Sequence, residues 1–169
     1  MSKFTLMNKN KKVFDFEYND EDHLIVEFER NYPDNEKYAP FGLIKDDNID
    51  KSGFNKWWKN RQIPASRNGL KEVLQKSNMY DKDNFDLLDA KAYCLSLSDQ
   101  YWVKRTTEDI LWEDINFFDN EFSEDIGKVL FSGGKTPLKL NLNTPDMTSN
   151  GNYEKRWKII NGDRYLIKA

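Results

Sequence analysis

Residues 153–168 read Y-E-K-R-W-K-I-I-N-G-D-R-Y-L-I-K, and this stretch decides how the C-terminal part of the chain folds. Two runs of apolar and basic residues, 153–160 and 164–168, flank the tripeptide Asn161-Gly162-Asp163. Asn and Gly accept the positive φ angles of a tight hairpin turn. The stretch therefore predicts two antiparallel strands, and the second of them ends in Lys168.

A third strand is predicted just upstream, at residues 138–142 (L-K-L-N-L), because apolar and polar side chains alternate strictly there. A polar loop, residues 144–152, with Pro145 and Gly151, separates this strand from the hairpin. The C-terminal part of the chain is thus predicted to run strand, small-residue loop, strand, tight turn, strand.

The N-terminal part mixes a hairpin with short helices. Residues 13–18 (V-F-D-F-E-Y) alternate, and residues 24–28 follow after a turn at Asn19-Asp20, which predicts a β-hairpin. Ser52 is a suitable N-cap for a helix that ends before Pro64. Further predictions are helices at 66–74, 83–93, 112–118 and 123–131, and an extended segment at 95–103. The predicted fold class is α+β, with an N-terminal subdomain at 1–134 followed by a strand-rich unit at 135–169.

The composition excludes several classes of protein. Of the 169 residues 14% are aromatic, which is enough for a core although 33% are charged. No apolar run reaches the roughly 20 residues of a membrane helix, and residues 1–12 do not resemble a signal peptide. The lone Cys94 excludes an internal disulfide and a cysteine-based zinc site. We therefore expect a folded protein of the reducing cytoplasm, without a metal site of its own.

Charge is distributed unevenly along the chain. Residues 81–125 hold thirteen acidic and four basic side chains, whereas residues 135–169 hold seven basic and three acidic ones. The net charge of −3 argues against a nucleic-acid or membrane partner for the whole molecule. The acidic middle is interpreted as a solvated face, with docking of a basic partner as the alternative.

One short cluster has the aromatic and basic composition of a nucleic-acid-binding patch. Trp57 and Trp58 lie next to Lys56, Lys59 and Arg61, and aromatic and basic side chains together can stack bases and bind phosphates. Packing of the two indoles in a core, with a solvated basic face, is the preferred interpretation.

The predicted C-terminal strands and loop have the arrangement that binds nucleotide phosphates in protein kinases. There, backbone N–H groups of a small-residue loop cover the phosphates, and a lysine on a following strand reaches the α- and β-phosphates. In this sequence Ser149, Asn150 and Gly151 would form the loop, and Lys168 would be the phosphate lysine. The alternative is a plain three-stranded sheet with solvated lysines.

Four segments resemble the N-terminal half of the HipA-like serine/threonine kinases: 54–74, 95–103 (L-S-L-S-D-Q-Y-W-V), 111–130 and 144–168. The resemblance extends over residues 41–169. It implies a small N-terminal subdomain packed on the start of a kinase N-lobe. It also places Tyr101 and Trp102 in the scaffold rather than in a ligand site.

The resemblance also implies a site and partners. Lys168 matches the ATP-binding lysine of the family, and residues 148–151 match its phosphate-covering loop, in which Ser149 is a candidate for autophosphorylation. ATP and Mg²⁺ are the implied cofactors. The growth-arresting kinases of the family are restrained by antitoxin proteins, so an antitoxin-type protein or a complementary kinase lobe is the implied partner.

The chain alone is predicted to be inactive. A kinase needs a glutamate that pairs with the lysine, an aspartate that accepts the substrate proton, and an Asn/Asp pair for magnesium. In the family these residues follow the lysine strand, so the chain is expected to be a truncated N-terminal portion with no catalytic residue. The alternative is a free-standing interaction module, an antitoxin-like small subunit or decoy that binds a partner kinase; a third possibility is a remnant without activity.

Overall fold

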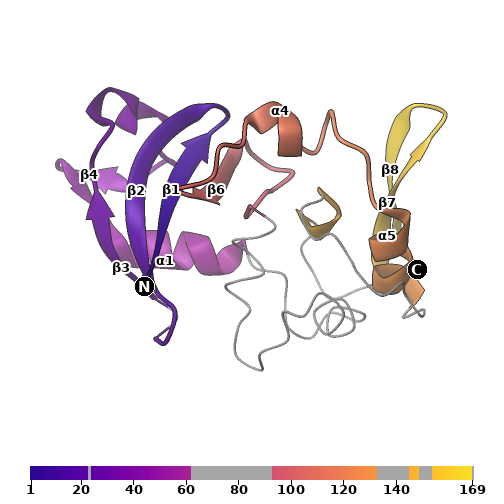
Figure 1. Ribbon diagram of the computed structural model, residues 1–169, viewed down its shortest axis with the longest axis horizontal. Coiled ribbons are helices and arrows are strands. Elements are labelled where there is room, and N and C mark those ends of the chain that lie inside the picture. The colour runs from indigo at the N-terminus through magenta and orange to yellow at the C-terminus, as the bar shows by residue number, and fades with distance from the viewer. Residues whose placement is uncertain (23, 62–92, 133–144, 149–153, 169) are drawn as a thin grey trace.

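The computed structural model describes residues 1–22, 24–61, 93–132, 145–148 and 154–168. These residues form an α+β protein with antiparallel sheets, as predicted (Figure 1). The predicted helix at 66–74 and the predicted strand at 138–142 fall on residues outside the described ones. So does the predicted helix at 83–93 except for its last residue, Tyr93, whose φ of 58° is not helical. No helix among the described residues is long and apolar enough to cross a membrane.

A four-stranded antiparallel sheet forms the N-terminal half of the molecule. Its strands are β1 (Ser2–Asn8), β2 (Lys11–Asn19), β3 (Leu24–Glu29) and β6 (Tyr101–Arg105), in the order β3-β2-β1-β6. The predicted hairpin of residues 13–18 and 24–28 is confirmed by the pairing of β2 with β3. The first strand, β1, was not predicted, although Phe4 and Leu6 alternate with Thr5 in its sequence. The predicted extended segment at 95–103 is a strand only from Tyr101 onward.

Helix α1 (Lys51–Asn60) packs across one face of this sheet and builds an aromatic core. Phe54 and Trp58 are its buried residues. The Phe54 ring lies 5.2 Å from that of Phe14 and 5.1 Å from that of Phe16, in edge-on geometry. Trp58 lies 5.5 Å from Phe16. Edge-to-face rings at such distances add to the free energy of area burial, so this cluster is the main core of the N-terminal half.

The helix begins two residues earlier than a Ser52 cap would allow. Asp50 is the N-cap, and its Oδ1 accepts a hydrogen bond from the Gly53 N–H at 2.8 Å. The prediction of Ser52 as the cap was therefore wrong. Aspartate caps a helix at least as well as serine does, and Gly53 leaves room for the carboxylate, since a Cβ there would stand 2.8 Å from Asp50 Oδ2.

A second cluster lies on the opposite face of the sheet, around Trp102. Its buried partners are Met7, Tyr93, Leu95, Trp112 and Ile115. The Trp102 Nε1–H donates to the Lys9 carbonyl at 2.8 Å. Helix α4 (Trp112–Ile115) is shorter than the predicted 112–118. The Asn116 side chain accepts hydrogen bonds from the N–H groups of Phe118 and Asp119, so it replaces the next helical turn.

The C-terminal described elements are helix α5 (Glu124–Ser132) and the strands β7 (Lys155–Ile160) and β8 (Asp163–Lys168). They confirm the predicted helix at 123–131 and the predicted hairpin. Asn161 and Gly162 adopt positive φ angles of 55° and 90° in its turn. Shorter elements are η1 (Pro33–Tyr38), β4 (Ile44–Lys45), β5 (Asn48–Ile49) and η2 (Pro145–Thr148).

We expect replacement of Trp102 by alanine to lower the free energy of unfolding by about 3–5 kcal/mol, because a fully buried indole is replaced by a cavity. Urea unfolding followed by circular dichroism measures the change. Leu97→Ala is the matched control, since Leu97 precedes the same strand but is exposed, and it should leave the midpoint nearly unchanged. Equal effects of the two substitutions would contradict the packing described for Trp102.

The Asp50 cap makes stability depend on pH. The hydrogen bond from the Gly53 N–H lowers the pKa of Asp50 below its ordinary 3.8. The contribution of the cap is therefore complete above that value and is lost as the pH falls through the lower pKa of the folded state. Asp50→Asn keeps a cap without a titrating group, so it should flatten this part of the stability profile between about pH 5 and 2. Unchanged acid dependence in the variant would contradict the assignment.

Candidate functional site

The β7–β8 hairpin carries the one predicted site residue whose side chain the structure describes, Lys168. Residues directly opposite each other in antiparallel strands share a face. Lys155 lies opposite Lys168, Trp157 opposite Leu166, and Ile159 opposite Arg164. These six residues form what we call the lysine face of the hairpin.

Lys168 is exposed at the end of β8, whereas its neighbour Lys155 is buried. The other predicted loop residues, Ser149, Asn150 and Gly151, lie outside the described residues. Thr148 is the last residue of η2. The structure therefore describes the lysine of the predicted phosphate site but not the loop.

Aromatic packing fixes the lysine face against the preceding segment. The Trp157 ring lies 4.3 Å from that of Phe117, edge-on, and 5.7 Å from that of Phe122, stacked. Arg164 donates from Nη1 to the Asn120 carbonyl at 2.6 Å. Its guanidinium lies 5.0 Å from the centre of the Phe122 ring. The middle of the face is thus packed, and its Lys155–Lys168 end lies away from the turn.

The opposite face of the hairpin rests on α5. Arg156 and Lys158 lie 3.7 and 3.9 Å from the Glu124 carboxylate. A Cβ at Gly127 would lie 3.5 Å from the Arg156 side chain, which is ordinary van der Waals contact, so α5 and β7 lie directly against each other. This contact between α5 and β7 joins residues on either side of position 134, where the sequence suggested a boundary.

The hairpin is strongly basic, and its charges differ between the two faces. It holds Lys155, Arg156, Lys158, Arg164 and Lys168 against Asp163 alone. On the α5 face, Glu124 lies close to both basic groups. A small hollow of about 240 Å³ beside β7 is lined by Glu121 and Glu124, by Lys158, and by Trp157 and Ile159 of the lysine face. Carboxylates would repel a phosphate there, so an anionic ligand fits the Lys155–Lys168 end of the lysine face better.

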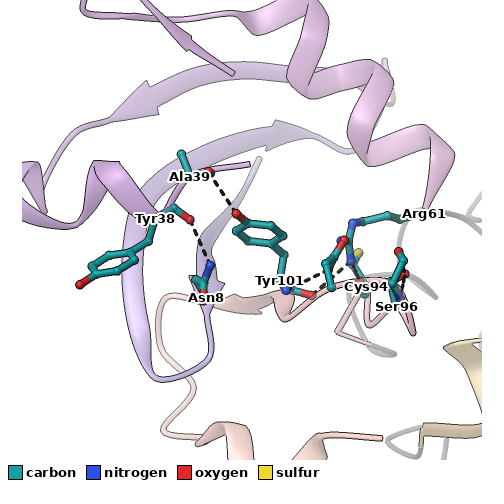
Figure 2. A network of polar contacts seen from close by, with 9 residues as sticks. Asn8, Tyr38, Ala39, Arg61, Cys94, Ser96 and Tyr101 are labelled. Atoms are coloured by element: carbon teal, nitrogen blue, oxygen red, sulfur yellow. Dashed lines mark hydrogen bonds and ion pairs between the residues drawn. The ribbon is translucent and has the colours of Figure 1, made fainter. Parts of the chain in front are cut away.

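Arg61 is a structural residue that the sequence did not single out as one. It was assigned to a solvated basic face, and this was wrong, because Arg61 is buried. Its Nη1 donates to the carbonyls of Cys94, at 2.6 Å, and Tyr101, at 3.2 Å, and its Nη2 pairs with Asp99 (Figure 2). Its guanidinium also lies 4.2 Å from the centre of the Trp57 ring.

This network explains the distinctive string at residues 95–103. Figure 2 shows that Tyr101 is held at both ends. Its hydroxyl donates to the Ala39 carbonyl at 3.1 Å, and its own carbonyl accepts from Arg61. Burial raises the pKa of Tyr101. Trp102 is fully buried. The prediction that Tyr101 and Trp102 belong to the scaffold is confirmed. Trp58 is also buried, whereas Lys56 and Lys59 are exposed, so the predicted packing of this cluster is confirmed for these residues.

Among the described residues, no group of three or more His, Cys, Asp and Glu side chains is arranged to hold a metal ion. Comparisons of the chain with protein-family models, with curated proteins and with solved structures find no match.

We expect Arg61→Lys to lower the free energy of unfolding by roughly 2–3 kcal/mol, because an ammonium group cannot replace the planar fork that serves Asp99 and two carbonyls. This value is at the lower end for a broken ion pair because Asp99 is partly exposed. Chemical unfolding measures it, with Lys59→Ala as the control on the same helix. A wild-type midpoint in Arg61→Lys would show that the fork is not needed.

Proposed function

We propose that the chain is the N-terminal portion of a HipA-like serine/threonine kinase and contributes part of its ATP site. In this proposal Lys168 binds the α- and β-phosphates of ATP–Mg²⁺ as a point charge, and residues 148–151 cover the phosphates with backbone N–H groups. Ser149 is then placed beside the γ-phosphate as a candidate for phosphorylation.

The position of Lys168 is the observation that supports the proposal. Lys168 is exposed at the end of a hairpin that is held by Trp157 on β7 and by Arg164 on β8. Lys155 lies directly opposite on the same face. A phosphate group near this end of the face would be attracted to the exposed ammonium group of Lys168.

The proposal leaves catalysis to a complementary lobe. Three aspartates that precede the hairpin have structural roles: Asp99 pairs with Arg61, Asp114 accepts from the Leu111 N–H at 2.9 Å, and Asp119 accepts from Asn116 Nδ2 at 2.8 Å. These roles support the inference that none of them is the base for a substrate hydroxyl. We therefore propose that the chain alone binds nucleotide but transfers no phosphoryl group.

A second candidate function is that of an interaction module that binds a HipA-like kinase or an antitoxin-type protein. The observation in its favour is the outer edge of β8, which pairs with no other strand among the residues that the structure describes. Either role fits a protein of the reducing cytoplasm, where ATP is abundant and the thiol of the buried Cys94 stays reduced.

Binding of ATP–Mg²⁺ is expected to raise the melting temperature of the chain. At a ligand concentration roughly tenfold above Kd the increase should be about 3 °C or more. Lys168→Ala should abolish most of it, because the variant removes the point charge at the phosphates. Lys158→Ala, on the opposite face of the same hairpin, is the matched control and should keep the shift.

Two outcomes would contradict this proposal. One is an ATP-induced shift of the same size in Lys168→Ala and in the wild-type chain. The other is radiolabelled phosphate that appears on the purified chain with γ-labelled ATP and disappears in Lys168→Ala, which would overturn the predicted inactivity.

A further inference from the structure

The outer edge of β6 is closed by the chain itself. The N–H of Tyr101 donates to the Asp99 carboxylate at 3.0 Å, that of Val103 to the Tyr93 carbonyl at 2.8 Å, and that of Arg105 to the Glu108 carboxylate at 2.9 Å. These are the alternate backbone groups that do not face β1. No further strand can add to this edge without displacing them.

The other edge of the four-stranded sheet is covered by α1. The Ile25 N–H donates to Asn55 Oδ1 at 3.0 Å, and Lys51 Nζ donates to the Val26 carbonyl at 2.7 Å. Both edges of the main sheet therefore make hydrogen bonds with the chain's own side chains and, at Val103, with its backbone, as expected for a sheet that avoids edge-to-edge association.

The outer edge of β8 differs from both. In a hairpin with a two-residue loop, the pair that flanks the turn exchanges both hydrogen bonds, and every second pair after it does the same. Asp163, Tyr165 and Ile167 thus bond to β7, whereas Arg164, Leu166 and Lys168 direct their N–H and C=O groups outward. Within the described residues β8 pairs with β7 alone, and it lies at the end of the molecule far from β3 (Figure 1).

We propose that the outer edge of β8 binds an acidic β-strand of another protein. An added strand places its side chains in register with Arg164, Leu166 and Lys168 on the lysine face. The exposed Lys168 is complemented by a carboxylate, and Leu166 by an apolar residue, at alternate positions of the incoming strand. Arg164 already donates to the Asn120 carbonyl, but its positive charge still favours a second carboxylate at the next alternate position. Tyr165 and Ile167, on the other face, meet its intervening apolar residues.

A second copy of this chain is a poor occupant of the same edge. Symmetric antiparallel pairing of two β8 strands about Leu166 would set each Arg164 opposite the Lys168 of the other copy. Directly opposed like charges are destabilising, so the charges of β8 select against self-pairing while they favour an acidic strand. This inference stands without the nucleotide proposal, because it uses the backbone edge and needs no ATP.

The test uses the full chain, without nucleotide, and a fluorescent peptide with the core Glu-Val-Leu-Val-Glu. Fluorescence anisotropy should show saturable binding that weakens about tenfold or more in Lys168→Glu. Lys56→Glu is the matched control, since Lys56 is exposed on α1 and gives the same change in net charge. The charge-reversed peptide Lys-Val-Leu-Val-Lys should not bind.

Backbone methylation separates strand addition from attraction between charges. Peptides N-methylated at one alternate set of amides should lose binding, and those methylated at the other set should keep it, because only one set faces β8. Absence of binding, equal binding by both methylated sets, or equal binding by Lys168→Glu and Lys56→Glu would overturn the proposal. A dimer of the free chain in sedimentation that becomes tighter in Lys168→Glu, where the new carboxylate would face Arg164 of the other copy, would also overturn it, in favour of self-pairing.

Discussion

The contact of Trp157 with Phe117 and Phe122 is the interaction on which the C-terminal half depends. An isolated two-stranded hairpin is marginally stable in water, and here one indole, packed against two phenyl rings, attaches it to the rest of the chain. Arg164 strengthens the attachment through the Asn120 carbonyl. The packed middle of the hairpin leaves Lys168 in a defined position at its end, which a point charge that recognises phosphate requires.

Acidic and basic side chains have different roles in this chain. Several acidic groups before the hairpin serve the backbone or a buried partner: Asp50 caps α1, Asp99 pairs with Arg61, and Glu108 closes the edge of β6. Among the basic groups of β7 and β8, Lys168 stays exposed. Thus acidic residues that a sequence pattern could suggest as catalytic are part of the scaffold, and the basic hairpin carries both proposed binding surfaces.

Short-range patterns allowed much of the fold to be predicted. The β2–β3 hairpin, α5 and the β7–β8 turn were predictable because alternation, a cap and an Asn-Gly turn act within a few residues.

The wrong predictions concern positions where two nearby residues are equally suitable, or where the partner of a side chain is far away in the sequence. Asp50 and Ser52 are both good caps, and Asn116 stops α4 with its own side chain. Arg61 looks like a surface residue until the Cys94 and Tyr101 carbonyls, more than thirty residues away, are brought to it. Lys168 was predicted to end the second strand of the Asn-Gly hairpin, and it is the last residue of β8.

The most direct test of the central proposal is side-chain ¹⁵N NMR of the lysine ammonium groups while ATP–Mg²⁺ is added. A phosphate bound at the end of the lysine face should shift the signals of Lys168 and Lys155 with one common saturation curve, while exposed lysines on α1, such as Lys56 and Lys59, stay unchanged. Small shifts spread evenly over all exposed lysines, or a saturating shift that excludes Lys168, would contradict the proposal that this hairpin binds the nucleotide.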